Sequence, residues 1–239
     1  FRDLDTELLG TEATYGAQGR RDDTREVVVK LAALHDDKKA LAILGREIAQ
    51  AATGMAPGLT GIVGGRPKPN PRIRLFSTLV DRNQVPATVD LDGNRFEVAA
   101  PAGEPLNTNA LPDTDGTETA TGETRVPLVK LAWARSGDKG NHANIGVIAR
   151  KADYLPYIRA ALSSEAVADY MKHVLDDDNG DVQRWELPGF NAFNFLLRNA
   201  LGGGGIASLR IDPQGKAFAQ QLLEFPVPVS EAIARELGA

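Results

Sequence analysis

The stretch from Val126 to Arg150, VPLVKLAWARSGDKGNHANIGVIAR, decides the expected architecture of the C-terminal half of the chain. Apolar residues alternate with other residues on both sides of a glycine-marked centre, which is the pattern of two strands joined by a loop. We therefore predict strands over Val126–Arg135 and Asn144–Arg150. The loop between them gathers an acid, a base, an imidazole and amides, so it is also a candidate site.

The residues after this stretch predict further helices and strands. The order β-loop-β-α-β-α-β indicates a compact α+β sandwich, in which helices cover one face of a four-stranded, mostly antiparallel sheet. The expected elements are a helix capped by Ser163 or Ser164, a strand over 182–187, a helix over 191–201, a strand over 206–211 and a helix over 216–224.

The first part of the chain, residues 1–103, predicts a strand, a helix and a hairpin. A β-branched run predicts a strand over Arg25–Leu34, and Asp36 or Asp37 then caps a helix that ends at Gly54. A glycine- and proline-rich loop follows, then a strand over Ile73–Val80 and a hairpin centred on Asp92-Gly93. Residues 104–125 contain no aromatic residue, valine or isoleucine, so we expect a flexible linker between this part and residues 126–239.

Composition excludes several classes of protein. With 42% apolar and 25% charged residues the chain should fold, and a net charge of −5 argues against a broad basic face for nucleic acid. The absence of cysteine excludes thiol catalysis and thiolate metal sites. The sequence has no apolar run near the roughly 20 residues of a membrane span. We expect a soluble, cytoplasmic protein, and the start at Phe1 suggests part of a longer or split one.

The loop after Trp133 carries the first candidate site. Two glycines allow the backbone to point several amides at one spot, and a lysine adds positive charge. Asp138 and His142 form a possible acid–base pair. Such a site suits a carboxylate, a phosphate or a thioester, although the same residues are ordinary turn chemistry and too few for a metal. The candidates are Ser136, Gly137, Asp138, Lys139, Gly140, His142 and Asn144.

Two other regions carry candidate ligand-binding residues. On the helix expected over 191–201, Asn191, Asn194 and Arg198 would share one face and hold an anion; alternatively they are a cap and a solvated polar face. In the proline-rich segment, the cations lie along an extended strip that suits the phosphates of coenzyme A, or an interface arm. They include Arg66, Lys68 and Arg72.

Three segments together resemble a known family. They are TGIVGGRPKPNPRIRLFSTLV (60–80), LVKLAWARSGDKGNHANIGVIAR (128–150) and LLEFPVPV (222–229). The chain resembles the acyclic terpene utilisation protein A (AtuA) family over residues 8–98 and 126–229. The family hallmark falls on Ser136, Gly137, Asp138, Lys139, Gly140 and Asn144. The resemblance implies that residues 1–103 are the C-terminal portion of a larger α/β domain. Residues 126–239 would be a small α+β ferredoxin-like domain.

The resemblance also implies a function. The family is associated with bacterial catabolism of citronellol- and geraniol-type compounds through branched acyl-CoA intermediates. We expect an enzyme, or part of one, that hydrates or cleaves a branched acyl-CoA. Lys139 would hold the acyl oxygen, Asp138 or His142 would move the proton, and the proline-rich cations would face coenzyme A.

No residue pattern indicates NAD, flavin or haem, so we expect no bound cofactor besides coenzyme A as the substrate carrier. The alternative is a non-catalytic assembly or binding subunit. In both cases we expect a homo-oligomer or a complex with a larger subunit, since a partial domain would expose apolar surface.

Overall fold

The computed structural model describes residues 1–21, 23–99, 103–105, 107 and 116–238. Its contacts divide the chain into two compact units: Phe1–Arg74 together with Asp115–Ala239, and Leu75–Thr114. The three-part division at 103 and 126 that the sequence suggests stays a prediction. Among the described helices, none combines the length and the apolar character that crossing a bilayer requires.

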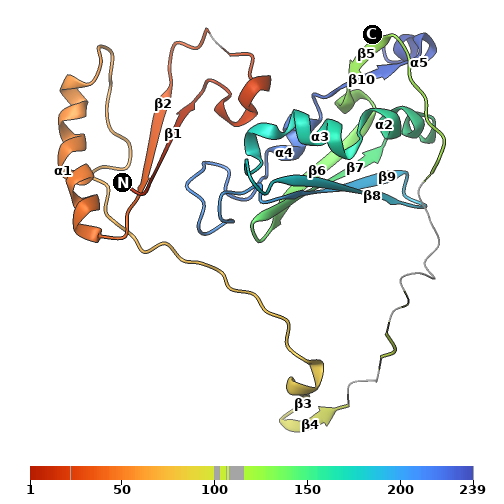
Figure 1. The fold of residues 1–239 in the computed structure, drawn as a ribbon, viewed down its shortest axis with the longest axis horizontal. Coiled ribbons are helices and arrows are strands. Elements are labelled where there is room, and N and C mark those ends of the chain that lie inside the picture. Colours follow the sequence, from red (N-terminus) through yellow and green to blue (C-terminus); the bar gives the residue numbers. More distant parts are fainter. Residues whose placement is uncertain (22, 100–102, 106, 108–115, 239) are drawn as a thin grey trace. The chain divides into compact units, whose positions relative to one another are not determined.

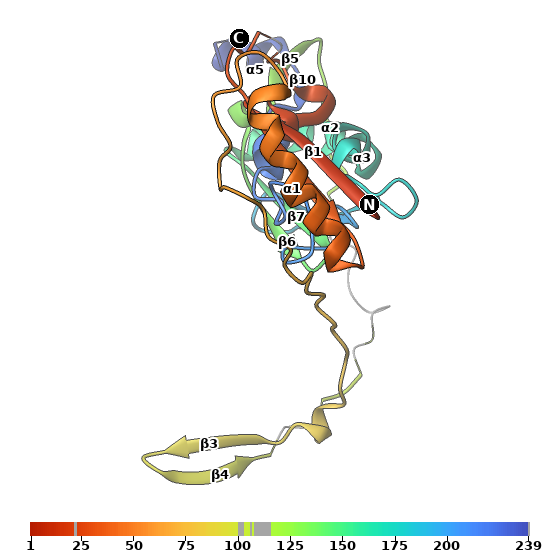
Figure 2. The ribbon, with the colours of Figure 1, turned by 90° about the vertical axis from the view of Figure 1, so that its left-hand side faces the viewer.

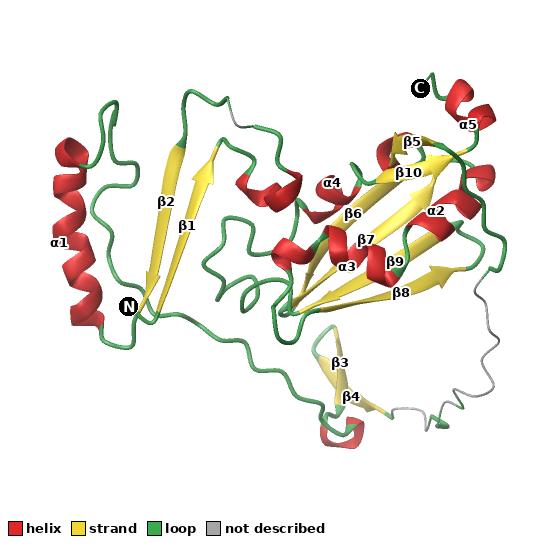
Figure 3. Cartoon of the chain, turned by 45° about the horizontal axis from the view of Figure 1, so that its top comes forward, coloured by secondary structure: helices red, strands yellow, loops and turns green. Residues whose placement is uncertain are grey.

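A four-stranded antiparallel sheet with the order β6-β7-β9-β8 is the largest sheet among the described residues (Figure 1). Helices α2 (Leu155–Ala161), α3 (Ser164–Tyr170) and α4 (Phe218–Leu222) lie on one face of this sheet (Figure 3). The predicted α+β sandwich, with helices on one face of a four-stranded antiparallel sheet, is therefore confirmed, but the strand expected over 206–211 is wrong, because the fourth strand is β9 and residues 206–211 form no strand. The strands are β6 (Ala132–Lys139), β7 (His142–Ala149), β8 (Asp181–Leu187) and β9 (Ala192–Arg198).

Strict alternation along the central strands produces the core. Every second side chain of β7 and β9 is buried against the helices, while the residues between them face the other side of the sheet. Burying one such side chain contributes about 1.5–3 kcal/mol. The buried set includes Ala143, Ile145 and Val147 of β7, Phe193, Phe195 and Leu197 of β9, and Ile158, Val167 and Leu222 of the helices.

The helix expected over 191–201 is wrong, because this segment is strand β9. Its apolar residues recur every second position, and that period overrides the helical spacing of its polar residues. Asn191 lies in the turn before β9 with a φ of 48°. The predicted strand over 182–187 is confirmed as β8, and Ser163 caps α3 as predicted, accepting from the Ala166 N–H.

The strand expected over Val126–Arg135 is interrupted. Strand β5 (Thr124–Pro127) pairs with β10 (Pro226–Val229), and a 3₁₀ turn over Leu128–Lys130 then leads into β6. The Leu128 N–H donates to the Phe225 carbonyl at 2.9 Å, which anchors this turn beside the second sheet. Helix α5 (Glu231–Glu236) ends the described chain; neither it, β10 nor α2 was predicted.

The N-terminal segment contains a pair of strands, labelled in Figure 3, and a long helix, α1 in Figure 2. Strand β1 (Asp3–Leu9) pairs antiparallel with β2 (Val28–Leu34), which confirms the core of the strand predicted there. Helix α1 (Lys38–Gly54) is capped by the Asp37 carboxylate, which accepts from the Lys39 N–H at 2.8 Å. Cap and stop signals therefore located this helix correctly.

The smaller unit holds the predicted hairpin. Strand β3 (Ala87–Leu91) pairs with β4 (Asn94–Val98) across Asp92 and Gly93, whose positive φ angles of 52° and 85° fit the Asp-Gly turn. The strand expected over Ile73–Val80 is wrong: these residues are exposed and form no regular element. A β-propensity run becomes a strand only where a neighbour supplies its hydrogen bonds.

Candidate functional site

The predicted loop after Trp133 is a tight β-hairpin. Strands β6 and β7 pair up to Lys139 opposite His142, so only Gly140 and Asn141 form the turn. Gly140 has a φ of 67°, as the first position of a two-residue hairpin turn requires. The expectation that the glycines bend this segment into a cradle of converging amides is therefore wrong, since Gly137 lies within the ladder opposite Asn144.

The hairpin separates the expected acid–base pair. Neighbouring residues of a strand point to opposite faces, and His142 pairs with Lys139, so Asp138 and His142 lie on opposite faces of the sheet. His142 Nδ1 accepts from the Asn199 N–H at 2.9 Å. The exposed Lys139 ammonium donates to the Asp138 carbonyl. Neither His142 nor Lys139 is placed to work with the Asp138 carboxylate.

A glycine loop, Gly202–Gly205, packs on the hairpin tip. Three successive residues, from Gly202 to Gly204, have φ angles of 61°, 109° and 89°. A Cβ added to Gly204 would lie 2.7 Å from the Gly140 carbonyl oxygen, so the two backbones approach too closely for any side chain. Asn141 holds this arrangement: its Oδ1 accepts from the Gly203 N–H at 2.7 Å.

Arg72 contacts the glycine loop, and Asp138, which is paired with Lys216, approaches the loop at Gly205. The Arg72 Nε donates to the Ala207 carbonyl at 2.7 Å, and its Nη2 lies 3.4 Å from the Gly202 carbonyl. The Lys216 ammonium lies 3.6 Å from Asp138 Oδ1. We call Gly202–Gly205 with Arg72, Lys216 and Asp138 the glycine-loop site. Sequence reasoning missed Lys216 and Asn141. Their partners, Asp138 and Gly203, are far from them along the chain and are brought to them only by the fold.

Ser136 has a structural position. Its buried hydroxyl donates to the Gly215 carbonyl at 2.6 Å and accepts from the Ala219 N–H at 2.9 Å. It therefore ties β6 to the start of α4 and leaves no free donor for a ligand. The same bonds hold the turn before Lys216, so Ser136 helps to position Lys216 in the glycine-loop site.

The remaining predicted ligand residues do not converge. Asn144 donates to Asn194 across β7 and β9 at 3.1 Å, whereas Arg198 lies 3.9 Å from Asp181 at the exposed end of the sheet. Since Asn191 lies in a turn, the expected anion-binding helix face does not exist. Of the proline-rich cations only Arg72 reaches the glycine-loop site. Arg66 and Lys68 are both exposed, and the segment that carries them packs against Gly45 of α1.

The face of the sheet opposite the helices carries exposed apolar side chains. Alternation places them on one face, and we call this surface the open face. The Arg150 guanidinium lies 4.5 Å from the centroid of the Trp133 ring. The exposed residues are Trp133, Ile148, Trp185 and Leu187.

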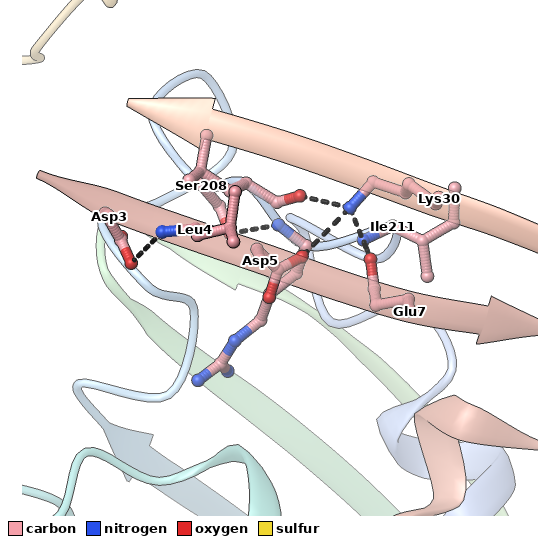
Figure 4. Close-up of polar contacts among 9 residues, drawn as sticks. Asp3, Leu4, Asp5, Glu7, Lys30, Ser208 and Ile211 are labelled. Atoms are coloured by element: carbon pink, nitrogen blue, oxygen red, sulfur yellow. Dashed lines mark hydrogen bonds and ion pairs between the residues drawn. The ribbon is translucent and has the colours of Figure 1, made fainter. Parts of the chain in front are cut away.

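A separate polar cavity of about 130 Å³ lies where β1 meets the C-terminal residues of the same unit. Lys30 of β2 joins the two sides: it contacts Asp5 at 3.1 Å, and also Glu7 and the Leu209 carbonyl (Figure 4). The Ile211 N–H donates to Glu7 at 2.8 Å. In the described stretches, no group of three or more acidic or histidine side chains is arranged to hold a metal ion.

Comparison with known proteins identifies two family models in the chain. The model described as the acyclic terpene utilisation family protein AtuA matches residues 1–91, and the AtuA ferredoxin-like domain matches residues 126–228. Searches of curated proteins and of solved structures returned no match. The two family models meet at the glycine-loop site, since Arg72 lies in the first and Asp138 in the second. The chain therefore belongs to the AtuA family of acyclic terpene utilisation proteins, and its four-stranded sheet is the family's ferredoxin-like domain.

Proposed function

We propose that the chain is an enzyme, or part of one, that acts on a branched acyl-CoA from acyclic terpene breakdown and binds the acyl group at the glycine-loop site. One observation carries the proposal: three left-handed glycines in succession lie beside Arg72, and Gly205, the next residue, lies beside Asp138 of the Lys216–Asp138 pair. The missing side chains let Arg72 pack against the loop backbone at Gly203 and let the hairpin tip pack against it at Gly204. Cations at such a backbone suit a thioester oxygen that gains negative charge.

The proposed reaction is hydration of a double bond conjugated to the thioester. The Asp138 carboxylate takes a proton from water while the hydroxyl adds to the β-carbon, and the electron pair moves onto the thioester oxygen as an enolate. Lys216 and Arg72 stabilise that charge. The enolate then collapses as the α-carbon receives the proton from Asp138, so atoms and charge balance. Carbon–carbon cleavage of a β-hydroxy acyl-CoA would use the same carboxylate and the same oxyanion contacts.

We expect Asp138→Asn to lower turnover of a methyl-branched, α,β-unsaturated acyl-CoA by at least about 100-fold, since general-base catalysis typically contributes that much or more. Lys216→Met should lower it as well, through loss of charge stabilisation. The assay follows loss of the conjugated thioester absorbance with the purified chain. Asp178→Asn, an exposed aspartate in the turn before β8, is the matched control and should retain full turnover.

Absence of turnover in the wild-type chain, or equal turnover in Asp138→Asn and Asp178→Asn, would contradict the catalytic assignment.

The second candidate function is then a non-catalytic assembly or binding subunit, which the open face favours. Its side chains Trp133 and Trp185 are 54% and 46% exposed, and exposed apolar patches commonly mark protein–protein interaction sites. In that role the chain would associate with itself or with a larger subunit through the open face.

A further inference from the structure

The hairpin of β3 and β4, which we call the arm, has two unlike sides (Figure 2). Residues paired across a hairpin lie on the same side, and neighbours along a strand lie on opposite sides. One side carries polar pairs, among them Asp90 with Arg95, whose Nε donates to the Asp90 carboxylate at 2.8 Å. We call the other side the arm face. It carries Ala87, Val89, Leu91, Asn94, Phe96 and Val98.

The arm face has no covering layer within its own unit. Its four large apolar side chains are 40–62% exposed. Among the described residues of Leu75–Thr114, β3 and β4 are the only strands, and no α-helix covers them. A two-stranded hairpin on its own is at best marginally stable in water. An arm with one apolar and one charged side therefore indicates a surface that packs against another surface.

The open face presents an apolar strip of matching length. In the register of the sheet, Trp133 pairs with Ile148, Ile148 with Ala192, and Ala192 with Leu187. The strip therefore crosses all four strands, and Trp185 extends it along β8. Four strands at about 4.8 Å spacing are about 19 Å wide, and a five-residue strand such as β3 is about 17 Å long. The arm face can therefore lie along the strip.

Charge distinguishes between the surfaces that could cover the open face. The described residues of this face include four cations and one carboxylate: Arg135, Lys139, Arg150, Arg198 and Asp181. Two open faces packed on each other would bring like charges together, which is unfavourable. The arm carries the opposite sign, since three carboxylates outnumber its one guanidinium: Asp90, Asp92, Glu97 and Arg95. Charge complementarity therefore favours the arm over a second open face.

A second copy of the chain supplies both surfaces at once. The arm face and the open face are both exposed in the single chain. A two-fold exchange of arms between two copies would cover both surfaces in each copy. The 14 residues from Ile73 to Pro86 join the arm to Arg72, which is bonded to the Ala207 carbonyl. That length of chain spans at most about 50 Å, which is enough to reach a neighbouring copy.

We infer that the chain forms a dimer in which the arm face of each copy packs on the open face of the other. The apolar strip receives the apolar side chains of the arm, and the cations of the open face attract the acidic arm. Each contact is small, so the two contacts act together and the dimer dissociates on dilution. The inference names the partner of the open face and does not depend on the reaction at the glycine-loop site.

Tryptophan fluorescence and sedimentation of the whole purified chain test the dimer. The two tryptophans of the chain, Trp133 and Trp185, both lie on the open face, so their emission reports on that face. We expect twice the 25.5 kDa mass of the chain at high concentration. Dilution should shift the emission to the red, because the open face then becomes exposed to water.

Substitutions on the two surfaces should have the same effect. Phe96→Asp on the arm face and Trp185→Asp on the open face each place a charge in both contacts of the dimer. We expect either one to raise the dimer dissociation constant at least about 100-fold, as for the central residues of an interface. The matched control is Thr88→Asp, which adds the same carboxylate to the polar side of the arm and should dimerise like the wild type.

A mixture of Phe96→Asp and Trp185→Asp distinguishes arm exchange from other dimers. The mixed pair keeps one intact arm face and one intact open face, so it should associate more tightly than either variant alone. A wild-type chain that stays monomeric, a dimer that Phe96→Asp leaves intact, or a mixture no tighter than the single variants would each overturn the inference. If Phe96→Asp unfolds the arm, Trp185→Asp still tests the open face. The acyl-CoA turnover of Phe96→Asp should equal that of the wild type, so failure of the dimer and failure of the proposed function are measured separately.

Discussion

Replacing Arg159 by methionine should lower the free energy of unfolding by about 3–5 kcal/mol, the usual effect of removing one partner from a buried ion pair. Arg159 on α2 and Glu186 on β8 form a two-pronged contact, with Nε 3.2 Å from Oε2 and Nη2 bonded to Oε1. Their side chains are only 8% and 7% exposed. Without the guanidinium, the Glu186 carboxylate would stay buried without its main partner. Urea unfolding of wild type and variant measures the loss.

The matched control is Arg198→Met. Arg198 lies 3.9 Å from Asp181 on the same sheet, but both side chains are about half exposed, so its removal should cost less than about 1 kcal/mol. Equal losses of unfolding free energy in Arg159→Met and Arg198→Met would contradict the argument that the buried ion pair contributes more than the exposed one. The Arg159 hydrogen bond also holds the pKa of Glu186 below its usual range.

A lowered folded-state pKa gives a definite pH dependence. The stabilisation is present above the ordinary glutamate pKa of about 4.3 and is lost as the pH falls through the folded value. Protonated Glu186 no longer needs the guanidinium, so the stability gap between wild type and Arg159→Met should narrow in acid. A gap that stays constant below pH 4 would contradict this assignment.

Substituting Gly204 by alanine should destabilise the chain by about 3–5 kcal/mol and abolish acyl-CoA turnover. Gly204 has a φ of 89°, which strains any L-residue by about 1–2 kcal/mol. Its Cβ would also lie 2.7 Å from the Gly140 carbonyl oxygen, so the glycine loop must leave the hairpin tip. That displacement separates Arg72 from Asp138 and dismantles the glycine-loop site. Urea unfolding and the thioester assay measure the two effects.

Gly189→Ala is the control for the strain alone. Gly189 has a φ of 81°, but no atom lies within 4 Å of its added Cβ. We expect a loss of about 1–2 kcal/mol and unchanged turnover. If both glycine variants lose the same stability and keep the same turnover, then the close packing of loop on hairpin has no functional importance.

Local signals in the sequence predicted local structure well. Asp37 and Ser163 cap their helices, and Asp92-Gly93 forms the expected hairpin turn, because each depends on bonds within a few residues. The predictions were wrong where tertiary contacts decide the secondary structure. The polar residues of β9 have a helical spacing, but burial of Phe193 and Phe195 between sheet and helices makes the segment a strand.

The candidate site was predictable only in part, for the same reason. Asp138 and Arg72 were identified by their residue types, whereas Lys216 meets Asp138 only through the fold and has no motif of its own. The backbone of Gly140 explains the glycine at position 204, and that contact joins positions more than sixty residues apart.

The most direct measurement is the backbone amide spectrum of the isotopically labelled chain, titrated with a methyl-branched, unsaturated acyl-CoA. The account predicts the largest saturable shifts at the amides of Gly202–Gly205 and at the hairpin turn of Gly140 and Asn141, with loss of these shifts in Arg72→Met. Shifts confined to the open face around Trp133 and Trp185, with the glycine amides unmoved, would contradict it and favour the docking role.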